Sequence, residues 1–388
     1  MLDVCLHTDP TSPNNRSVPL TLPASRRDLL AAQADLRADS LREVFVEIVA
    51  VPDYRNLNSC LRHVRAENDL TDKLNFFASR LQDMSPEDRW SLDAMCCLRG
   101  PENMRDLINL SYSAGYLVSE PDVSTEKELG EFLVENGFRE FPDEVVPYLD
   151  FAKIGREHYA ENTCGFIDNA YCEHTGDVAA VYDGVTLPER SEPDFIFQIE
   201  LAEPENAADV YPTVMLALPT DDEDIAEALN TLSVPSLSDC VIVNGRSDIE
   251  RFDGLIDDET DPAWLNHLAG QIAVMSDDEY IKFLAVAKHQ QALESDDPVQ
   301  SLADLALRLD GYRLDPAIID AEQLARNELS LDCPDLLPFV DLEAYGRHWL
   351  GERDASVGNF GYVREMITPE MAQSFEPVES CGPEMGGM

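Results

Sequence analysis

Acidic residues dominate this chain of 388 residues, in which 76 Asp and Glu stand against 28 Lys and Arg for a formal net charge of −48. Such a surface repels nucleic acid and anionic lipid, and it attracts proteins whose own working surface is basic, DNA-binding proteins above all. With 44% hydrophobic residues, 15 Phe and 12 Tyr, the chain can still bury sizeable cores, which excludes a disordered acidic polymer.

The charge by itself is compatible with a nucleic-acid mimic, a salt-adapted protein or an acidic calcium buffer. Since DNA carries about two negative charges per base pair, the net charge corresponds to roughly 24 base pairs. Salt adaptation would explain the scarcity of lysine, which occurs only at Lys73, Lys127, Lys153, Lys282 and Lys288.

The cysteines and the apolar pattern bear on localisation. Nine scattered cysteines indicate reduced thiols and a cytoplasmic protein rather than a disulfide framework. The N-terminus has no basic region followed by an apolar one, and nowhere do 18 apolar residues run together. We therefore expect neither secretion nor membrane insertion.

In chain order, the pattern first predicts a strand at 2–6, a helix at 29–36 and a strand at 44–49. A helix at 74–81 follows, and Ser85 is expected to cap the next helix, around 90–95. Further helix is predicted at 127–136, with short strands near 165–171.

The same order then recurs. Strands are predicted at 195–201, 240–243 and 358–363, and helices at 225–232, 265–272, 280–287 and 301–309, with Ser276 as an N-cap. Pro147–Arg156 recurs as Pro338–Arg347, keeping Pro, Asp, Gly and Arg in register. Leu74-Asn75 likewise matches Leu265-Asn266, and Leu22-Pro23 matches Leu218-Pro219.

These anchors indicate a tandem duplication. The first unit spans about residues 1–172 and the second, more acidic one about 195–366. Residues 173–194 form a predicted linker in which 178–182 could add a short strand, and 367–388 form a predicted flexible tail.

The repeated segments resemble the ArdA family of antirestriction proteins. The resemblance rests on the following segments: Leu74-Asn75, Met84–Asp88, Lys127–Gly130 and Tyr148–Glu157 in the first unit, and Leu265-Asn266, Val340–Arg347 and Gly361–Arg364 in the second. It implies an elongated α+β chain of small mixed α/β and helical subdomains, here duplicated. It also implies a DNA mimic that occupies the DNA-binding groove of type I restriction-modification enzymes and protects incoming mobile-element or phage DNA.

Members of that family usually carry one unit and act as dimers, so this chain is expected to be either a monomer with two units or a homodimer. Its expected partner is the basic groove of a restriction-modification complex or of another defence complex such as a CRISPR effector. We expect no direct nucleic-acid binding and no membrane partner. The less favoured reading, an acidic halophile structural protein, predicts unfolding at low salt.

The charge is unevenly distributed. Residues 1–190 carry 34 acids and 18 bases, a net of −16, whereas residues 191–388 carry 42 acids and 10 bases, a net of −32. Basic stretches at Arg26-Arg27 and 62–65 would interrupt a phosphate mimic if they shared its face. The second unit is therefore the better candidate for the mimic.

Acids clustered at turns and helix starts of the second unit are the candidate phosphate surrogates, since a helix N-terminus favours negative charge. They are Asp221, Asp222, Glu223, Asp224, Asp253, Asp257, Asp258, Glu259, Asp261, Asp277, Asp278, Glu279, Glu294, Asp296 and Asp297. Ordinary helix capping is the alternative for each cluster. Asp150 and Asp341, inside the repeated motif, are expected to make structural ion pairs or turn hydrogen bonds instead.

The sequence has no phosphate loop, no Gly-x-Ser-x-Gly elbow and no His-Glu-x-x-His helix. Cys164, Cys172 and His174 could surround a metal, but buried thiols are the preferred interpretation. Asp253–Glu259 lacks the pattern of an EF-hand loop. We expect a protein that is not an enzyme and has no cofactor, catalytic residue or metal.

Overall fold

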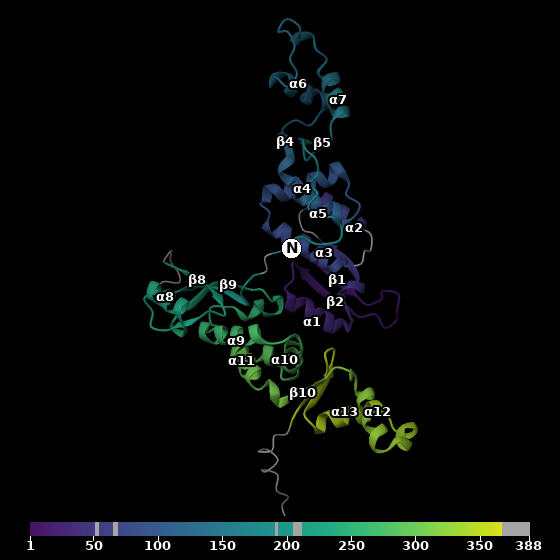
Figure 1. Cartoon of the computed structure of the whole chain (residues 1–388), viewed down its shortest axis with the longest axis vertical. Coiled ribbons are helices and arrows are strands. Elements are labelled where there is room, and N and C mark those ends of the chain that lie inside the picture. The colour runs from purple at the N-terminus through teal and green to yellow at the C-terminus, as the bar shows by residue number, and fades with distance from the viewer. Residues whose placement is uncertain (51–53, 65–68, 191–192, 205–211, 367–388) are drawn as a thin grey trace, which may run out of the picture. The chain divides into compact units, whose positions relative to one another are not determined.

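The computed structural model describes residues 1–50, 54–64, 69–190, 193–204 and 212–366. Helices alternate with four small antiparallel sheets of three strands each in this part of the chain, which confirms the predicted α+β class (Figure 1). The α-helices are α1 Arg26–Leu36, α2 Arg55–His63, α3 Leu70–Asp83, α4 Pro86–Arg99, α5 Met104–Ser111, α6 Glu126–Glu135, α7 Phe151–Glu161, α8 Asp222–Leu232, α9 Pro262–Val274, α10 Asp277–His289, α11 Pro298–Leu307, α12 Ala321–Asp332 and α13 Leu342–Glu352. The strands are β1 Leu2–His7, β2 Ser17–Leu22, β3 Phe45–Ala50, β4 Leu117–Pro121, β5 Cys164–Ile167, β6 Ala170–His174, β7 Phe197–Ala202, β8 Val214–Leu218, β9 Val241–Ser247, β10 Tyr312–Asp315, β11 Ala355–Gly358 and β12 Gly361–Glu365.

The chain forms two compact units whose boundaries cut across the repeat. The first unit contains Met1–Ser25 and Ala38–Glu192, and the second contains Arg26–Arg37 and Pro193–Met388. Helix α1, which belongs to the first repeat by sequence, is thus part of the second unit. None of the helices in the described residues is both long and apolar enough to cross a bilayer.

The two units have the same sheet topology. The sheets of the first unit have the strand orders β2-β1-β3 and β4-β6-β5, and those of the second have β8-β7-β9 and β10-β12-β11. In β1, Leu2, Val4 and Leu6 are buried while the residues between them are not, because successive side chains of a strand point to opposite faces. The repeated strand order agrees with the duplication inferred from the sequence.

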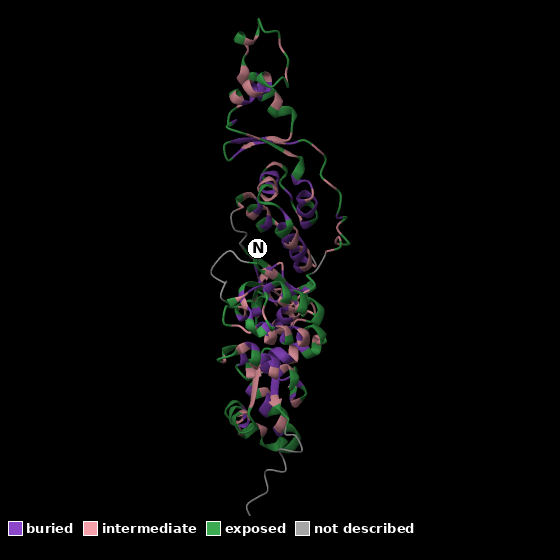
Figure 2. Cartoon of the chain, turned by 90° about the vertical axis from the view of Figure 1, so that its left-hand side faces the viewer, coloured by how far each residue is buried: buried purple, intermediate pink, exposed green. Residues whose placement is uncertain are grey.

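Each unit has its own apolar core. Figure 2 shows that the buried residues lie mainly on helices and strands, and that many loops are exposed. In the second unit Phe197, Phe252 and Phe283 are fully buried, and the Phe252 ring lies 6.5 Å, between centroids, from each of the other two, tilted to one and edge-on to the other. In the first, Phe77 on α3 and Leu92 on α4 have no exposed surface.

Equivalent residues perform equivalent structural tasks in the two units. Ser85 caps α4 and Ser276 caps α10, as predicted. The amide of Asn75 bonds the backbone N–H and C=O of Ala24, and that of Asn266 bonds those of Thr220.

The repeated Asp and Gly also have defined roles. Asp150 and Asp341 accept backbone N–H groups at the starts of α7 and α13, which confirms turn hydrogen bonds as their role. A Cβ atom on Gly155 would lie 1.8 Å from the carbonyl oxygen of Glu126, and one on Gly346 would lie 1.9 Å from that of Ala321. Only glycine therefore allows α7 to approach α6, and α13 to approach α12, this closely.

The segment expected to be a linker is partly integrated into the first unit. Residues 173–174 complete β6, and 178–182 form no strand, so the suggestion of a strand there is wrong. Tyr182 is instead buried, and the N–H groups of Val181 and Tyr182 donate to Asn109 Oδ1 at 3.0 and 2.7 Å. The predicted tail, 367–388, lies outside the described residues.

Candidate functional site

Three of the candidate acids are N-cap residues of helices in the second unit. Asp221 accepts the N–H groups of Glu223 and Asp224 at the start of α8. Asp261 and Asp297 cap α9 and α11, which both continue with a proline. Each carboxylate faces the positive end of a helix dipole, which stabilises its charge.

Eight of the fifteen candidates have a structural partner. Besides the three caps, Asp253 accepts Ser247 N–H at 2.8 Å, and Asp257 accepts Glu259 N–H at 3.0 Å. Hydrogen bonds from the side chain and backbone of Ser276 lower the pKa of Glu279. The full set is Asp221, Asp224, Asp253, Asp257, Asp261, Asp277, Glu279 and Asp297.

The remaining seven carboxylates have no hydrogen bond or ion pair with any residue that the structure describes. They are Asp222, Glu223, Asp258, Glu259, Asp278, Glu294 and Asp296, and all seven are exposed. A carboxylate without a protein partner keeps its lone pairs for a partner molecule. The clusters therefore combine capping carboxylates with others that are open to solvent.

Two clusters that are distant in the sequence line one pocket. Asp257, Glu259 and Asp261 from the segment before α9 meet Asp296 and Asp297 from the segment before α11 around a cavity of about 210 Å³. The indole of Trp264 forms part of its wall, and its described lining contains no Lys, Arg or His. Carboxylates beside an aromatic face suit a guanidinium or ammonium group. The clusters at 221–224 and 277–279 do not line this pocket.

Helix α1 places two arginines, Arg26 and Arg27, within the second unit. Arg26 forms an ion pair with Asp277 at 2.8 Å, so this candidate acid is neutralised. Arg27 donates to the carbonyls of Ile272 and Met275, and its guanidinium lies 4.8 Å from the centre of the Tyr280 ring. These contacts account for the basic pair at 26–27, whereas Arg65 lies outside the described residues.

The structural boundaries keep the charge asymmetry. With α1 included, the second unit has 43 acids and 13 bases, a net of −30, against 33 acids and 15 bases, a net of −18, in the first. The lower charge of the first unit is consequently a property of the folded unit and not of the sequence division alone.

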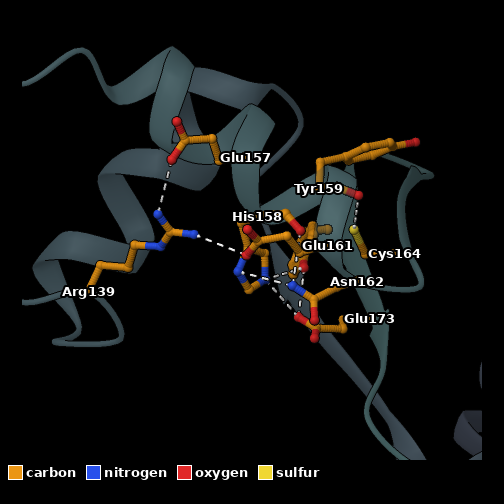
Figure 3. A network of polar contacts seen from close by, with 9 residues as sticks. Arg139, Glu157, His158, Tyr159, Glu161, Asn162, Cys164 and Glu173 are labelled. Carbon is orange, nitrogen blue, oxygen red and sulfur yellow. Dashed lines mark hydrogen bonds and ion pairs between the residues drawn. The ribbon is translucent and has the colours of Figure 1, made fainter.

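The first unit holds a different polar cluster, between α7 and β6 (Figure 3). His158 Nε2 lies 2.9 Å from the Tyr171 hydroxyl and 3.0 Å from Glu173 Oε2, and that hydroxyl donates to Glu173 at 2.7 Å. Nearby, Arg139 reaches Glu157 and Glu161 at 3.3 and 3.4 Å. These contacts join α7 to the sheet and to the segment after α6.

The thiols in this region have the properties of buried structural groups. Burial raises the pKa of Cys164, and it raises that of Cys172 to about 11. A thiol with a raised pKa stays protonated at neutral pH and is a weak nucleophile.

The suggested metal ligands do not converge. Cys164 lies opposite Glu173 in the sheet and shares its face, whereas Cys172 and His174 lie on the other face. His174 contacts the guanidinium of Arg99 instead. No group of three or more His, Cys, Asp or Glu that could hold a metal ion occurs in the described ranges.

Sequence reasoning found the acid clusters but missed Trp264 as a wall of their shared pocket. A tryptophan three residues after the capping Asp261 was the available signal. Neither the models of protein families nor the curated proteins include a match to this chain.

Proposed function

We propose that this protein is an ArdA-like DNA mimic that inhibits type I restriction-modification enzymes by occupying their DNA-binding groove. One observation carries the proposal: seven exposed carboxylates of the second unit have no partner among the described residues, and they cluster at helix starts and turns. A basic groove built to bind phosphates would pair with such carboxylates.

The acidic pocket gives this charge a local geometry. An arginine or lysine of the groove would enter between the segments before α9 and α11, pair with Asp296 and Glu259, and contact the face of Trp264. Several carboxylates around one cation strengthen the attraction beyond that of a single exposed pair, since their charges act together on the same group.

The charge of the whole chain governs the rate of association. A net charge of −48 steers the protein toward a basic groove, and salt screens this attraction over about 10 Å at 0.1 M. Inhibition should therefore be fast at low salt and weaken steeply as the salt concentration rises.

The test is a titration of the full chain into restriction and methylation assays of a purified type I enzyme at several DNA concentrations. Competition predicts stoichiometric inhibition whose midpoint rises with DNA concentration. Cleavage and methylation that persist at large molar excess, or a midpoint that ignores DNA concentration, would exclude the proposal.

The same titration against a CRISPR effector distinguishes the related hypothesis of another defence target. A circular dichroism spectrum in low-salt buffer separates both from salt adaptation. A mimic stays folded there, whereas a salt-adapted protein unfolds.

A further inference from the structure

Each unit exposes one large aromatic ring at the equivalent position of its repeated motif. Tyr148 is 86% exposed and Phe339 is 85% exposed. Both follow a proline and both precede by two residues the aspartate that caps the next helix. Exposure of such a ring forgoes the free energy of burying it, so its occurrence at both equivalent positions points to an interaction site.

Both rings are carried by a fixed backbone. Tyr148 ends the 3-10 turn Val146–Tyr148 and Phe339 ends the 3-10 turn Pro334–Phe339. In the first unit the next residue, Leu149, packs against the core formed around α6 and α7, and Asp150 caps α7. The Tyr148 ring is therefore exposed although the residue that follows it packs against this core; the loop that carries it joins α6 to α7 (Figure 1).

The chain segments that lead to both rings are acidic. Asp143 and Glu144 are exposed before Tyr148, and Asp332 and Asp335 are exposed before Phe339. A partner that accepts one of these rings must offer an apolar or aromatic pocket with basic groups beside it. A planar ring flanked by negative charges has the chemistry of an unstacked nucleobase flanked by phosphates.

We propose that Tyr148 and Phe339 imitate unstacked nucleobases and enter a base-accepting pocket of the inhibited enzyme. Enzymes that methylate DNA turn their target base out of the duplex and hold it between aromatic or apolar side chains. The inference rests on the proposed function, and it adds a specific recognition element to the general charge mimicry.

The experiment compares two double variants of the full chain in the methylation assay. Y148L/F339L keeps an apolar side chain but removes both planar rings, whereas Y148F/F339Y keeps both rings. V185A/V274A, which alters side chains that are 85% and 83% exposed at other positions, is the matched control. Because the altered side chains are exposed, all variants should fold, which circular dichroism checks.

Stacking of one ring is worth about 1–3 kcal/mol, so the inhibition constant of Y148L/F339L should rise at least tenfold. Y148F/F339Y and V185A/V274A should inhibit like the wild type. Equal inhibition by Y148L/F339L and the wild type would overturn the inference and leave the proposed function intact. A wild-type chain that fails to inhibit would overturn both.

A second measurement reports on the rings directly. The chain already contains Trp90, Trp264 and Trp349, so the added indole of F339W or Y148W is read as the difference between the emission of the variant and that of the wild type. This difference should change in intensity or emission maximum when the methylating enzyme is added, because the ring leaves water. An emission spectrum that stays that of a water-exposed indole in the inhibited complex would overturn the inference.

Discussion

The α6–α7 segment with its sheet and the α12–α13 segment with its sheet share their backbone arrangement, but different side chains pack between helix and sheet. Both use an aspartate cap and a glycine at the helix–helix approach. The first joins helix and sheet through His158, Tyr171 and Glu173, whereas the second packs Trp349 on Tyr362 at 6.3 Å. At the helix–helix approach only glycine fits, whereas the side chains between helix and sheet can be replaced by others that occupy a similar volume.

The glycine approach should give the largest effect. In α13, Gly346→Ala places a Cβ against the Ala321 carbonyl and should lower the free energy of unfolding of this segment by about 3 kcal/mol. Gly351→Ala, in the same helix with open space around it, should raise it by about 0.5 kcal/mol. Hydrogen exchange of the α12 and α13 amides, measured as urea is added, gives the free energy of unfolding of this segment in each variant. Equal effects of the two substitutions would show that the close approach of α13 to α12 does not require glycine at position 346.

The second largest effect is expected at the equivalent asparagines, Asn75 and Asn266. Asn75 is buried and bonds Ala24 at 2.7 and 3.0 Å, whereas Asn266 is half-buried and bonds Thr220 at 2.9 and 3.3 Å. Asn75→Ala should therefore cost about 2 kcal/mol, because buried backbone groups lose their partner, and Asn266→Ala should cost about 1 kcal/mol. The midpoints of urea denaturation give the ranking, and the reverse order would contradict it.

The equivalent tyrosines test whether the polar cluster is specific to the first unit. Tyr171→Phe removes the hydrogen bond to Glu173 and should cost about 1 kcal/mol. The buried Tyr362 hydroxyl has Arg364 nearby but no partner at hydrogen-bond geometry in the described residues. Tyr362→Phe should thus change the free energy of unfolding by less than about 0.5 kcal/mol. Equal losses in the two variants would remove this distinction.

The smallest effect is a pH dependence confined to the first unit. Burial, and secondarily the charge of Arg99, lowers the pKa of His174 below its ordinary value of 6.5. The native state binds fewer protons than the unfolded state, so this contribution is complete above pH 6.5 and is lost as the pH falls below it. The protection factors of the β6 amides, which correct for the slower intrinsic exchange at lower pH, should fall between pH 7 and 5.5 in the wild type and less so in His174→Gln; identical profiles would contradict the assignment.

Local features of the fold were predictable from the sequence, but its tertiary placements were not. The strand at Leu2–Leu6 and the caps Ser85 and Ser276 depend on neighbouring residues and were found. Helices α2 and α5 were missed, and each is shorter than ten residues and offers few turns for a periodic pattern. The longer helices α7, α12 and α13 were missed as well, although the repeated motif was found at the start of α7 and α13.

Helix α1 illustrates what the sequence could not predict. Its amphipathic pattern predicts a helix, but nothing local indicates that Ala31 packs among residues from Phe197 onward, more than 160 positions along the chain. The acidic pocket is a similar case, because Glu259 and Asp296 meet only once α9 and α11 have packed. Which candidate acids accept structural hydrogen bonds and which do not likewise depends on the geometry of the folded chain, and the composition of the clusters does not reveal it.

The central claim is that unpartnered carboxylates of the second unit compete with DNA. The decisive measurement is the salt-dependent inhibition constant of two quadruple variants against a type I enzyme. D222N/E223Q/D258N/D278N removes four such charges from the second unit, and D83N/E87Q/E102Q/E135Q removes four exposed charges from the first. We predict that the former weakens inhibition on the order of tenfold or more and flattens its salt dependence, while the latter has a much smaller effect. Equal effects of the two variants, or no effect of either, would contradict the account.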